Sequence, residues 1–90
     1  MRVVNTKRHR FTHYIGRPSL FGNPFVLGRD GDRDRVITMF EQMARRDPSM
    51  LAAIKVLPEN AILGCYCKPL ACHGDVIVKL WKEMHSCAGA

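Results

Sequence analysis

The chain has 90 residues, of which 47% are hydrophobic and 24% are charged. This length supports one hydrophobic core and excludes a multidomain enzyme, and the composition excludes disorder over most of the chain. The formal net charge of +6 favours an anionic partner such as nucleic acid or a nucleotide. The excess lies at one end, because residues 1–29 contain no acid and include the basic residues Arg2, Lys7, Arg8, Arg10, Arg17 and Arg29.

No apolar run is long enough to span a bilayer, because the longest candidates are interrupted by Pro58, Lys79 and Lys82. The first ten residues, MRVVNTKRHR, lack the apolar stretch of a secretion signal. We therefore expect a cytoplasmic protein without a membrane partner.

Short runs of β-forming residues at Val3-Val4 and from Thr12 to Ile15 predict one or two strands near the start of the chain. Two turn clusters follow, GRPS at residues 16–19 and GNP at residues 22–24. They predict that residues 16–31 lack regular structure. Because this loop contains several large apolar side chains, we expect it to pack against another part of the molecule.

Two helices are predicted next, with almost no loop between them. Helical periodicity begins at Asp32, and the apolar positions are Val36, Met39, Phe40 and Met43. Asp30, Asp32 or Asp34 can cap this helix. Asp47-Pro48 is typical of a second helix start, and Pro58 ends that helix. Its apolar positions are Met50, Leu51, Ile54 and Leu57.

The last third of the chain predicts one strand and one helix. Ala61 to Cys67 (AILGCYC) is a nearly continuous apolar run bounded by Pro58 and Pro69, which favours a buried strand. A third helix begins near residues 72–75, where Asp75 complements the helix dipole. The apolar positions of this helix are Val76, Ile77, Leu80, Trp81 and Met84.

This order of elements predicts an α/β fold, a small sandwich with a short, mostly parallel sheet and about three helices. We expect residues 1–85 to form a single domain and residues 86–90 to form a flexible tail in which Cys87 has no partner. Ligands of such sheets bind beyond the carboxyl ends of the strands. The loop that begins at Gly16 and the segment from Cys65 to His73 both follow predicted strands, so a site is expected there.

Three cysteines and a histidine crowd this edge in the pattern Cys65-x-Cys67-x4-Cys72-His73. Residues two apart on a strand face the same side, and Pro69 turns the chain back toward them. Three sulfurs and an imidazole can form a tetrahedral zinc site, so these four residues are candidate zinc ligands. The spacing differs from the C-x2-C pairs of common zinc modules.

Other interpretations of the cluster remain open. A helix N-terminus lowers the pKa of a thiol, so Cys72 is a candidate nucleophile with His73 as its base or proton donor. Alternatively, Cys65 and Cys72 only pack in the core, and His73 caps the helix. A redox switch through Cys65, Cys67 and Cys72 is a further alternative.

The turn clusters carry residues that suit an anion. Arg17, Ser19 and Asn23 lie beside glycines, whose backbone amides an anion can approach closely, so they are candidate ligands of a phosphate or nucleotide. The helix start near His73-Gly74 is a second candidate anion site. The alternative is that Asn23 only makes a turn and that Arg17 is a solvated surface charge.

Lys7, Arg8 and Arg10 are candidate contacts to nucleic-acid phosphates, and such contacts are independent of base sequence. They can equally form a solvated arm. No ordered array of aromatic residues accompanies them in the sequence, which gives no support for recognition of single strands by stacking.

The motifs YIGRPS (14–19), GNPF (22–25) and CYCKPLACHGD (65–75) resemble those of a domain of unknown function found in phages, plasmids, bacteria and archaea. The resemblance runs from Val3 to about Met84. A second uncharacterised family is distantly similar, and it has an acidic residue where this chain has Cys67. The features shared with that family are Cys65 and the Cys72-His73 pair. Both resemblances imply the fold and the place of the site, and neither implies a reaction.

Together these features predict one pocket that binds a nucleotide or a nucleic-acid phosphate, lined by Arg17, Ser19, Asn23, Cys72 and His73. In an enzyme, Arg17 would hold the anion, and Cys72 or His73 would act on the substrate, as in nucleotide or base processing. The alternative is an interaction protein of a phage or mobile element. Its basic face would bind a host protein or DNA, with zinc or thiols serving only as structural support.

Overall fold

The computed structural model describes residues 1–86, which form three strands and three helices. In chain order they are β1 (Arg2–Asn5), β2 (His13–Tyr14), α1 (Arg33–Arg45), α2 (Pro48–Lys55), β3 (Ile62–Cys65) and α3 (His73–Ser86). The predicted α/β class, with its short parallel sheet and three helices, is confirmed. Of the predicted tail, Ser86 is the last residue of α3, and residues 87–90, including Cys87, lie outside the described residues.

The sheet has the strand order β1-β3-β2, and both outer strands run parallel to β3. The chain from β2 to β3 passes through α1 and α2, because a parallel pair requires a long crossover. The register pairs Val3 with Leu63 and Tyr14 with Gly64. The carboxyl ends of β2 and β3 therefore lie side by side.

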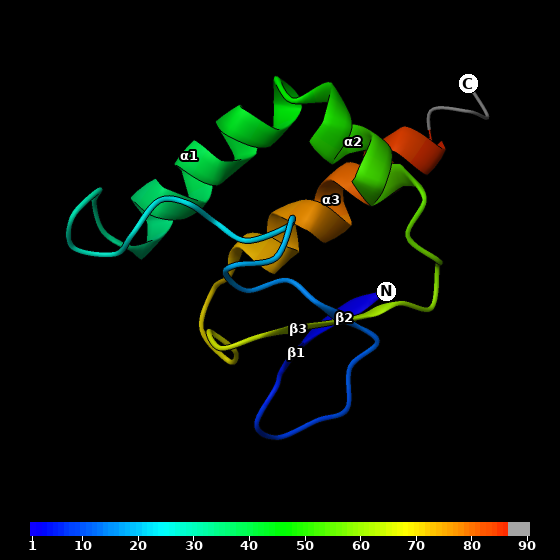
Figure 1. Ribbon diagram of the computed structural model, residues 1–90, viewed down its shortest axis with the longest axis horizontal. Helices are drawn as coiled ribbons and strands as arrows, with labels where there is room; N and C mark the ends of the chain where they lie inside the picture. The colour runs from blue at the N-terminus through cyan, green and yellow to red at the C-terminus, as the bar shows by residue number, and fades with distance from the viewer. Residues whose placement is uncertain (87–90) are drawn as a thin grey trace.

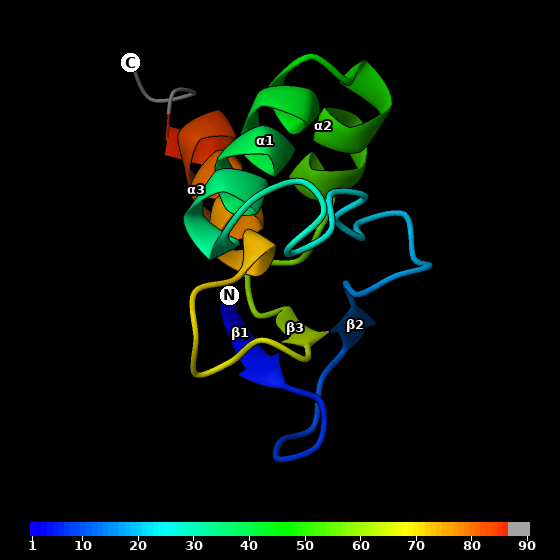
Figure 2. The same cartoon turned by 90° about the vertical axis from the view of Figure 1, so that its left-hand side faces the viewer.

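The three helices cover one face of the sheet, while the loop between β1 and β2 lies on the other side (Figures 1 and 2). The start of α3 approaches the sheet so closely that a Cβ on Gly74 would lie 2.7 Å from Cδ1 of Ile15 and 2.8 Å from Cγ1 of Val3. The largest fully buried side chains are Phe40, Ile15, Ile54, Leu63 and Ile77. Among the described residues, no helix has the length and apolar character needed to cross a membrane.

The helix starts follow the predicted capping. The Oδ1 atom of Asp32 accepts the backbone N–H of Arg35 at 2.9 Å, and Asp47 accepts the N–H groups of the first turn of α2. Asp30, which the sequence offered as an alternative cap, instead accepts the N–H of Val26 at 2.7 Å and stabilises the loop before α1. Local hydrogen bonding thus sets where α1 and α2 begin.

Three predicted elements are shorter in the structure, and the strand expected from Thr12 to Ile15 comprises only His13 and Tyr14. The last strand ends at Cys65 instead of Cys67, because the chain turns toward Pro69, which has no N–H for a ladder, and the N–H of Leu70 bonds the carbonyl of Cys67 at 2.8 Å. Helix α2 ends at Lys55, because Pro58 disfavours helical geometry in the residue before it.

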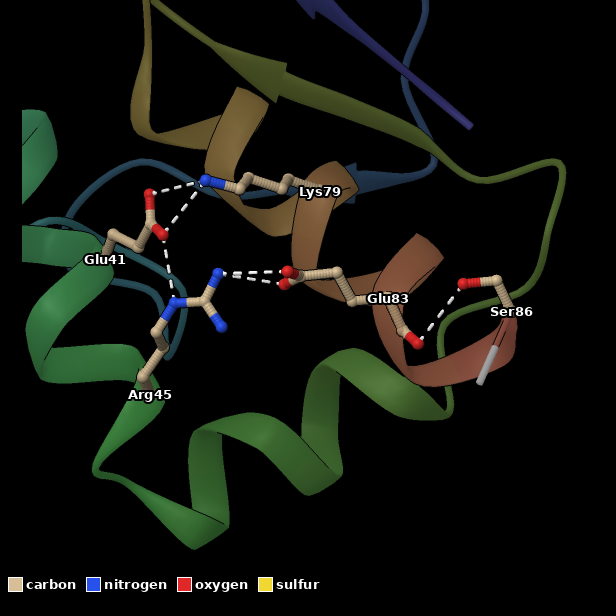
Figure 3. A network of polar contacts seen from close by, with 5 residues as sticks. All are labelled: Glu41, Arg45, Lys79, Glu83 and Ser86. Atoms are coloured by element: carbon tan, nitrogen blue, oxygen red, sulfur yellow. Dashed lines mark hydrogen bonds and ion pairs between the residues drawn. The ribbon is translucent and has the colours of Figure 1, made fainter. Parts of the chain in front are cut away.

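A network of charged side chains joins α1 to α3 (Figure 3). The Arg45 guanidinium pairs with Glu41 at 2.9 Å and with Glu83 of α3 at 2.9 Å. Glu41 also pairs with Lys79 of α3 at 3.1 Å. Lys79 and Arg45 hold the pKa of the Glu41 carboxyl below its usual value, because both donate hydrogen bonds to the charged form.

We expect Glu41→Gln to lower the free energy of unfolding by about 0.5–1 kcal/mol at neutral pH, since exposed ion pairs contribute little. The folded pKa of Glu41 is lowered, so this contribution is present above the unfolded pKa and is lost as pH falls through the folded pKa. Urea unfolding at pH 7 and pH 3 measures the difference from the parent chain. Glu59→Gln is the control, and an equal effect of Glu41→Gln at both pH values would contradict the prediction.

Candidate functional site

A cavity of about 350 Å³ lies at the carboxyl ends of β2 and β3. Its apolar wall comes from the loop before α1 and from α1 itself, and its polar side is formed by the end of β3 and the start of α3. Of the residues predicted to line a pocket at this edge, four do so, namely Arg17, Asn23, Cys72 and His73. Ser19 is not part of the cavity wall. The chain segments singled out in the sequence thus meet in one place.

Three cysteines border the cavity as a cluster. The sulfur atoms of Cys65, Cys67 and Cys72 all lie within 4.8 Å of one another, and all three residues are free thiols. Cys65 is the last residue of β3, Cys67 lies in the following turn, and Cys72 directly precedes α3. Cys65 and Cys72 are buried, with 3.0 Å between their sulfurs, and Cys67 is half-buried. This group can hold a metal ion.

The start of α3 positions Cys72 through a reciprocal cap. The sulfur of Cys72 accepts the N–H of Gly74 at 3.3 Å, and the Oδ2 atom of Asp75 accepts the N–H of Cys72 at 3.2 Å. Lys68 pairs with the other oxygen of Asp75 at 2.8 Å. This arrangement is a capping box with cysteine in place of serine. The spacing from Cys72 to Asp75 is the sequence signal that could have revealed it.

A hydrogen bond joins the thiols of Cys65 and Cys72. The Cys72 thiol donates to the Cys65 sulfur, and with the backbone N–H groups of Cys67 and Lys68 this lowers the pKa of Cys65 from 9.0 to about 5. The same contact, together with burial, raises the pKa of Cys72. The helix N-terminus predicts a lowered pKa for Cys72, whereas its contact with Cys65 acts in the opposite direction, and Cys72 as a nucleophile stays a prediction.

His73 is buried between the sheet and α1. Its Nε2 lies 2.8 Å from the carbonyl oxygen of Ile15, which assigns the ring proton to Nε2, and its ring packs edge-on against Phe40 with 5.0 Å between centroids. Burial lowers the pKa of His73, which favours the neutral ring. Nδ1 lies 3.6 Å from the Cys72 sulfur. The metal-capable group found in residues 1–86 contains only the three sulfurs, and His73 as a fourth ligand stays a prediction.

The predicted anion ligands differ in their availability. Within the described part of the chain, the exposed Arg17 guanidinium makes no hydrogen bond or ion pair. Asn23 is engaged, because its amide donates to the carbonyl of Val36 at 3.1 Å and its oxygen accepts the N–H of Phe25 at 2.9 Å. The Ser19 hydroxyl is buried and has no partner among residues 1–86. Arg17 is therefore the one of these three that is free to meet a ligand.

Two residues that hold the site together carry no clear signal in the sequence. Arg33 of α1 lines the cavity and donates to the carbonyl of Ala71 at 3.1 Å, which ties α1 to the turn before α3. Asn5, at the end of β1, donates to the carbonyl of Lys68 at 2.9 Å and fixes the start of the same turn. Both contacts join residues that are far apart in the chain.

The basic residues Lys7, Arg8 and Arg10 lie outside the cavity. They are exposed in the loop between β1 and β2, on the side of the sheet that faces away from the helices (Figure 2). Their contact with nucleic acid stays a prediction, and the structure separates it from the cavity residues.

The chain has two relevant matches among known proteins. The model of a domain of unknown function, DUF4326, matches residues 2–83. The chain is also 34% identical over 83 residues to the "Uncharacterized 12.4 kDa protein in nrdA-td intergenic region" of Enterobacteria phage T4, an alignment that covers 88% of this chain and 75% of the phage protein. No solved structure matches the chain. These findings confirm the resemblance to a domain of unknown function that occurs in phages.

Proposed function

The chain belongs to the DUF4326 family, and from this premise we propose that it binds a nucleoside phosphate in the cavity at the carboxyl edge of its sheet. The observation that carries the proposal is the pairing of an apolar wall with Arg17, a cation that has no partner within the described residues. The cavity volume of about 350 Å³ is in the range of small-ligand sites.

The two parts of the ligand would meet different sides of the cavity. Phe25, Val26 and Ile37 offer an apolar surface on which a base can pack. The guanidinium of Arg17 can bind a phosphate through two hydrogen bonds. The start of α3 is less suited to the anion, because Cys72 already accepts the N–H of Gly74. The proposal therefore assigns the phosphate to Arg17.

The same proposal includes a zinc ion at Cys65, Cys67 and Cys72. Thiolate sulfurs are preferred ligands of zinc, and the sulfur with the lowered pKa, Cys65, is readily available as a thiolate. Three protein sulfurs leave one of the four positions of zinc to another ligand. His73 is a candidate for this position through Nδ1, since Nε2 is already bound to the carbonyl of Ile15.

Calorimetric titration with adenosine monophosphate, adenosine and inorganic phosphate tests the cavity. We expect the monophosphate to bind more tightly than either fragment, and Arg17→Ala to weaken it at least about tenfold through loss of a charge-assisted contact. Arg46→Ala is the matched control, because Arg46 is equally exposed but lies at the end of α1. Equal affinities of the Arg17→Ala and parent chains, or no binding at millimolar ligand, would refute the proposal.

A further inference from the structure

The charges of the chain are divided between its two layers. The strands and the segments that adjoin them, residues 1–15 and 60–74, contain five of the 14 lysines and arginines and none of the eight acids. The remaining residues contain nine basic side chains and all eight acids. The sheet side therefore attracts polyanions, whereas the helix side is nearly neutral.

An aromatic cluster lies on the face of the sheet that the helices leave uncovered. The ring centroids of Phe11 and Tyr14 are 6.4 Å apart, and those of Tyr14 and Tyr66 are 5.9 Å apart. Phe11 lies over the central strand, since a Cβ on Gly64 would be 2.6 Å from its ring. Phe11 is 42% exposed and Tyr66 is 62% exposed. Two ring surfaces are thus accessible to a planar partner.

The basic loop lies beside this aromatic cluster and is held in shape by Asn5. The backbone N–H groups of Arg8 and His9 bond the carbonyl of Asn5 at 3.0 and 3.1 Å, and the N–H of Lys7 bonds its side-chain oxygen at 2.8 Å. Residues 6–11 line a shallow hollow. Basic residues and an aromatic residue therefore border the same depression.

We propose that this face binds single-stranded nucleic acid, with bases stacked on Phe11 and Tyr66 and phosphates paired with Lys7, Arg8 and Arg10. Stacking platforms inside a basic surface are the features that bind single strands without sequence preference. Duplexes bury their base faces, so the exposed rings favour unpaired strands. No ordered array of aromatic residues is visible along the chain, and the fold assembles a cluster from residues 11, 14 and 66.

This surface is distinct from the nucleoside phosphate cavity. Tyr14 and Tyr66 border both, but Phe11 and the basic loop residues do not line the cavity. Variants of Phe11 and of the loop therefore test the surface alone. Arg17→Ala tests the cavity alone.

Fluorescence anisotropy with a labelled 15-nucleotide oligothymidine and a 15-base-pair duplex tests the inference. We expect tighter binding of the single strand, at least about tenfold weaker binding by the double variant Arg8→Glu, Arg10→Glu, and a smaller salt slope for that variant. Phe11→Ala should weaken binding of the single strand about fivefold to 100-fold, because it removes a stacking surface. Circular dichroism establishes that each variant is folded.

Arg46→Glu is the control, since it changes the charge on the helix side. The inference would be overturned if Arg46→Glu and a single Arg10→Glu lowered the affinity for the single strand equally. It would also be overturned if the parent chain bound duplex and single strand with equal affinity. Unchanged single-strand binding in both the Phe11→Ala and the double variant would contradict it as well. If both variants lose the oligonucleotide but still bind adenosine monophosphate, the surface is supported independently of the cavity.

Discussion

Removing the proposed zinc ion is expected to lower the free energy of unfolding by about 4 kcal/mol, relative to the protein at a zinc concentration 1,000 times the dissociation constant. For a domain of this size, that change corresponds to a fall of roughly 15–30 °C in melting temperature. The effect is large because the ion would connect β3, the following turn and the start of α3 through three sulfur atoms that lie within 4.8 Å of one another. Differential scanning calorimetry before and after chelation measures it.

Metal analysis by mass spectrometry identifies the ligands. The parent chain should contain about one zinc per molecule, and Cys65→Ser and Cys72→Ser should each abolish most of it. Cys67→Ser tests the third sulfur. Cys87→Ser completes the set, since Cys87 lies outside the described residues. Zinc well below one per chain, with no change of melting temperature on chelation, would remove the metal from the proposal.

His73→Ala is expected to lower the free energy of unfolding by about 2–4 kcal/mol. The substitution leaves the buried carbonyl of Ile15 without its partner and opens a cavity beside Phe40. His73→Gln should recover part of the loss, because a glutamine amide can still donate a hydrogen bond. Urea unfolding of both variants measures these differences.

His9→Ala is the control for this series, because His9 is exposed. A loss below about 0.5 kcal/mol in His73→Ala would show that the contact to Ile15 contributes little to folding. The zinc content of folded His73→Gln separates two roles of this residue. Unchanged zinc excludes His73 as the fourth ligand, and a fall in zinc supports it.

The positions of the helices α1 and α2 could largely be predicted from the sequence. The apolar periodicity around Phe40 and the caps Asp32 and Asp47 place α1 and α2 close to their observed bounds. These features are local, since a cap and its N–H partner lie two or three residues apart. The predicted ends of helices and strands were less accurate where a proline follows several residues later, as at the end of α2 before Pro58.

The location of the candidate site also followed from the sequence. Parallel strands place their carboxyl ends at one edge, so the segments after Tyr14 and after Cys65 had to meet. The clustering of three cysteines within eight residues made a metal-capable group predictable. Its members lie close in the chain, and one turn at Pro69 is enough to bring their sulfurs together.

The thiol pKa values and the hydrogen-bond partners of the side chains at the site depend on contacts that could not be predicted from the sequence. The pKa of the Cys65 thiol is lowered and that of Cys72 is raised. The reason is that the Cys65 sulfur accepts hydrogen bonds from the Cys72 thiol and from backbone N–H groups of the turn. Asn23 is engaged with α1, and His73 bonds a residue 58 positions away. Hydrophobic periodicity and capping describe only neighbours in the chain, so they carry no information on such partners.

The uncovered sheet face illustrates the same division. The basic charge of the N-terminal third is a property of composition and was plain from the start. Phe11, Tyr14 and Tyr66 become one cluster only when β2 and β3 pair, because pairing residue 14 with residue 64 brings two chain segments about 50 positions apart onto one surface. Local sequence thus determines the elements and their charge, and the packing of these elements determines which side chains can act together.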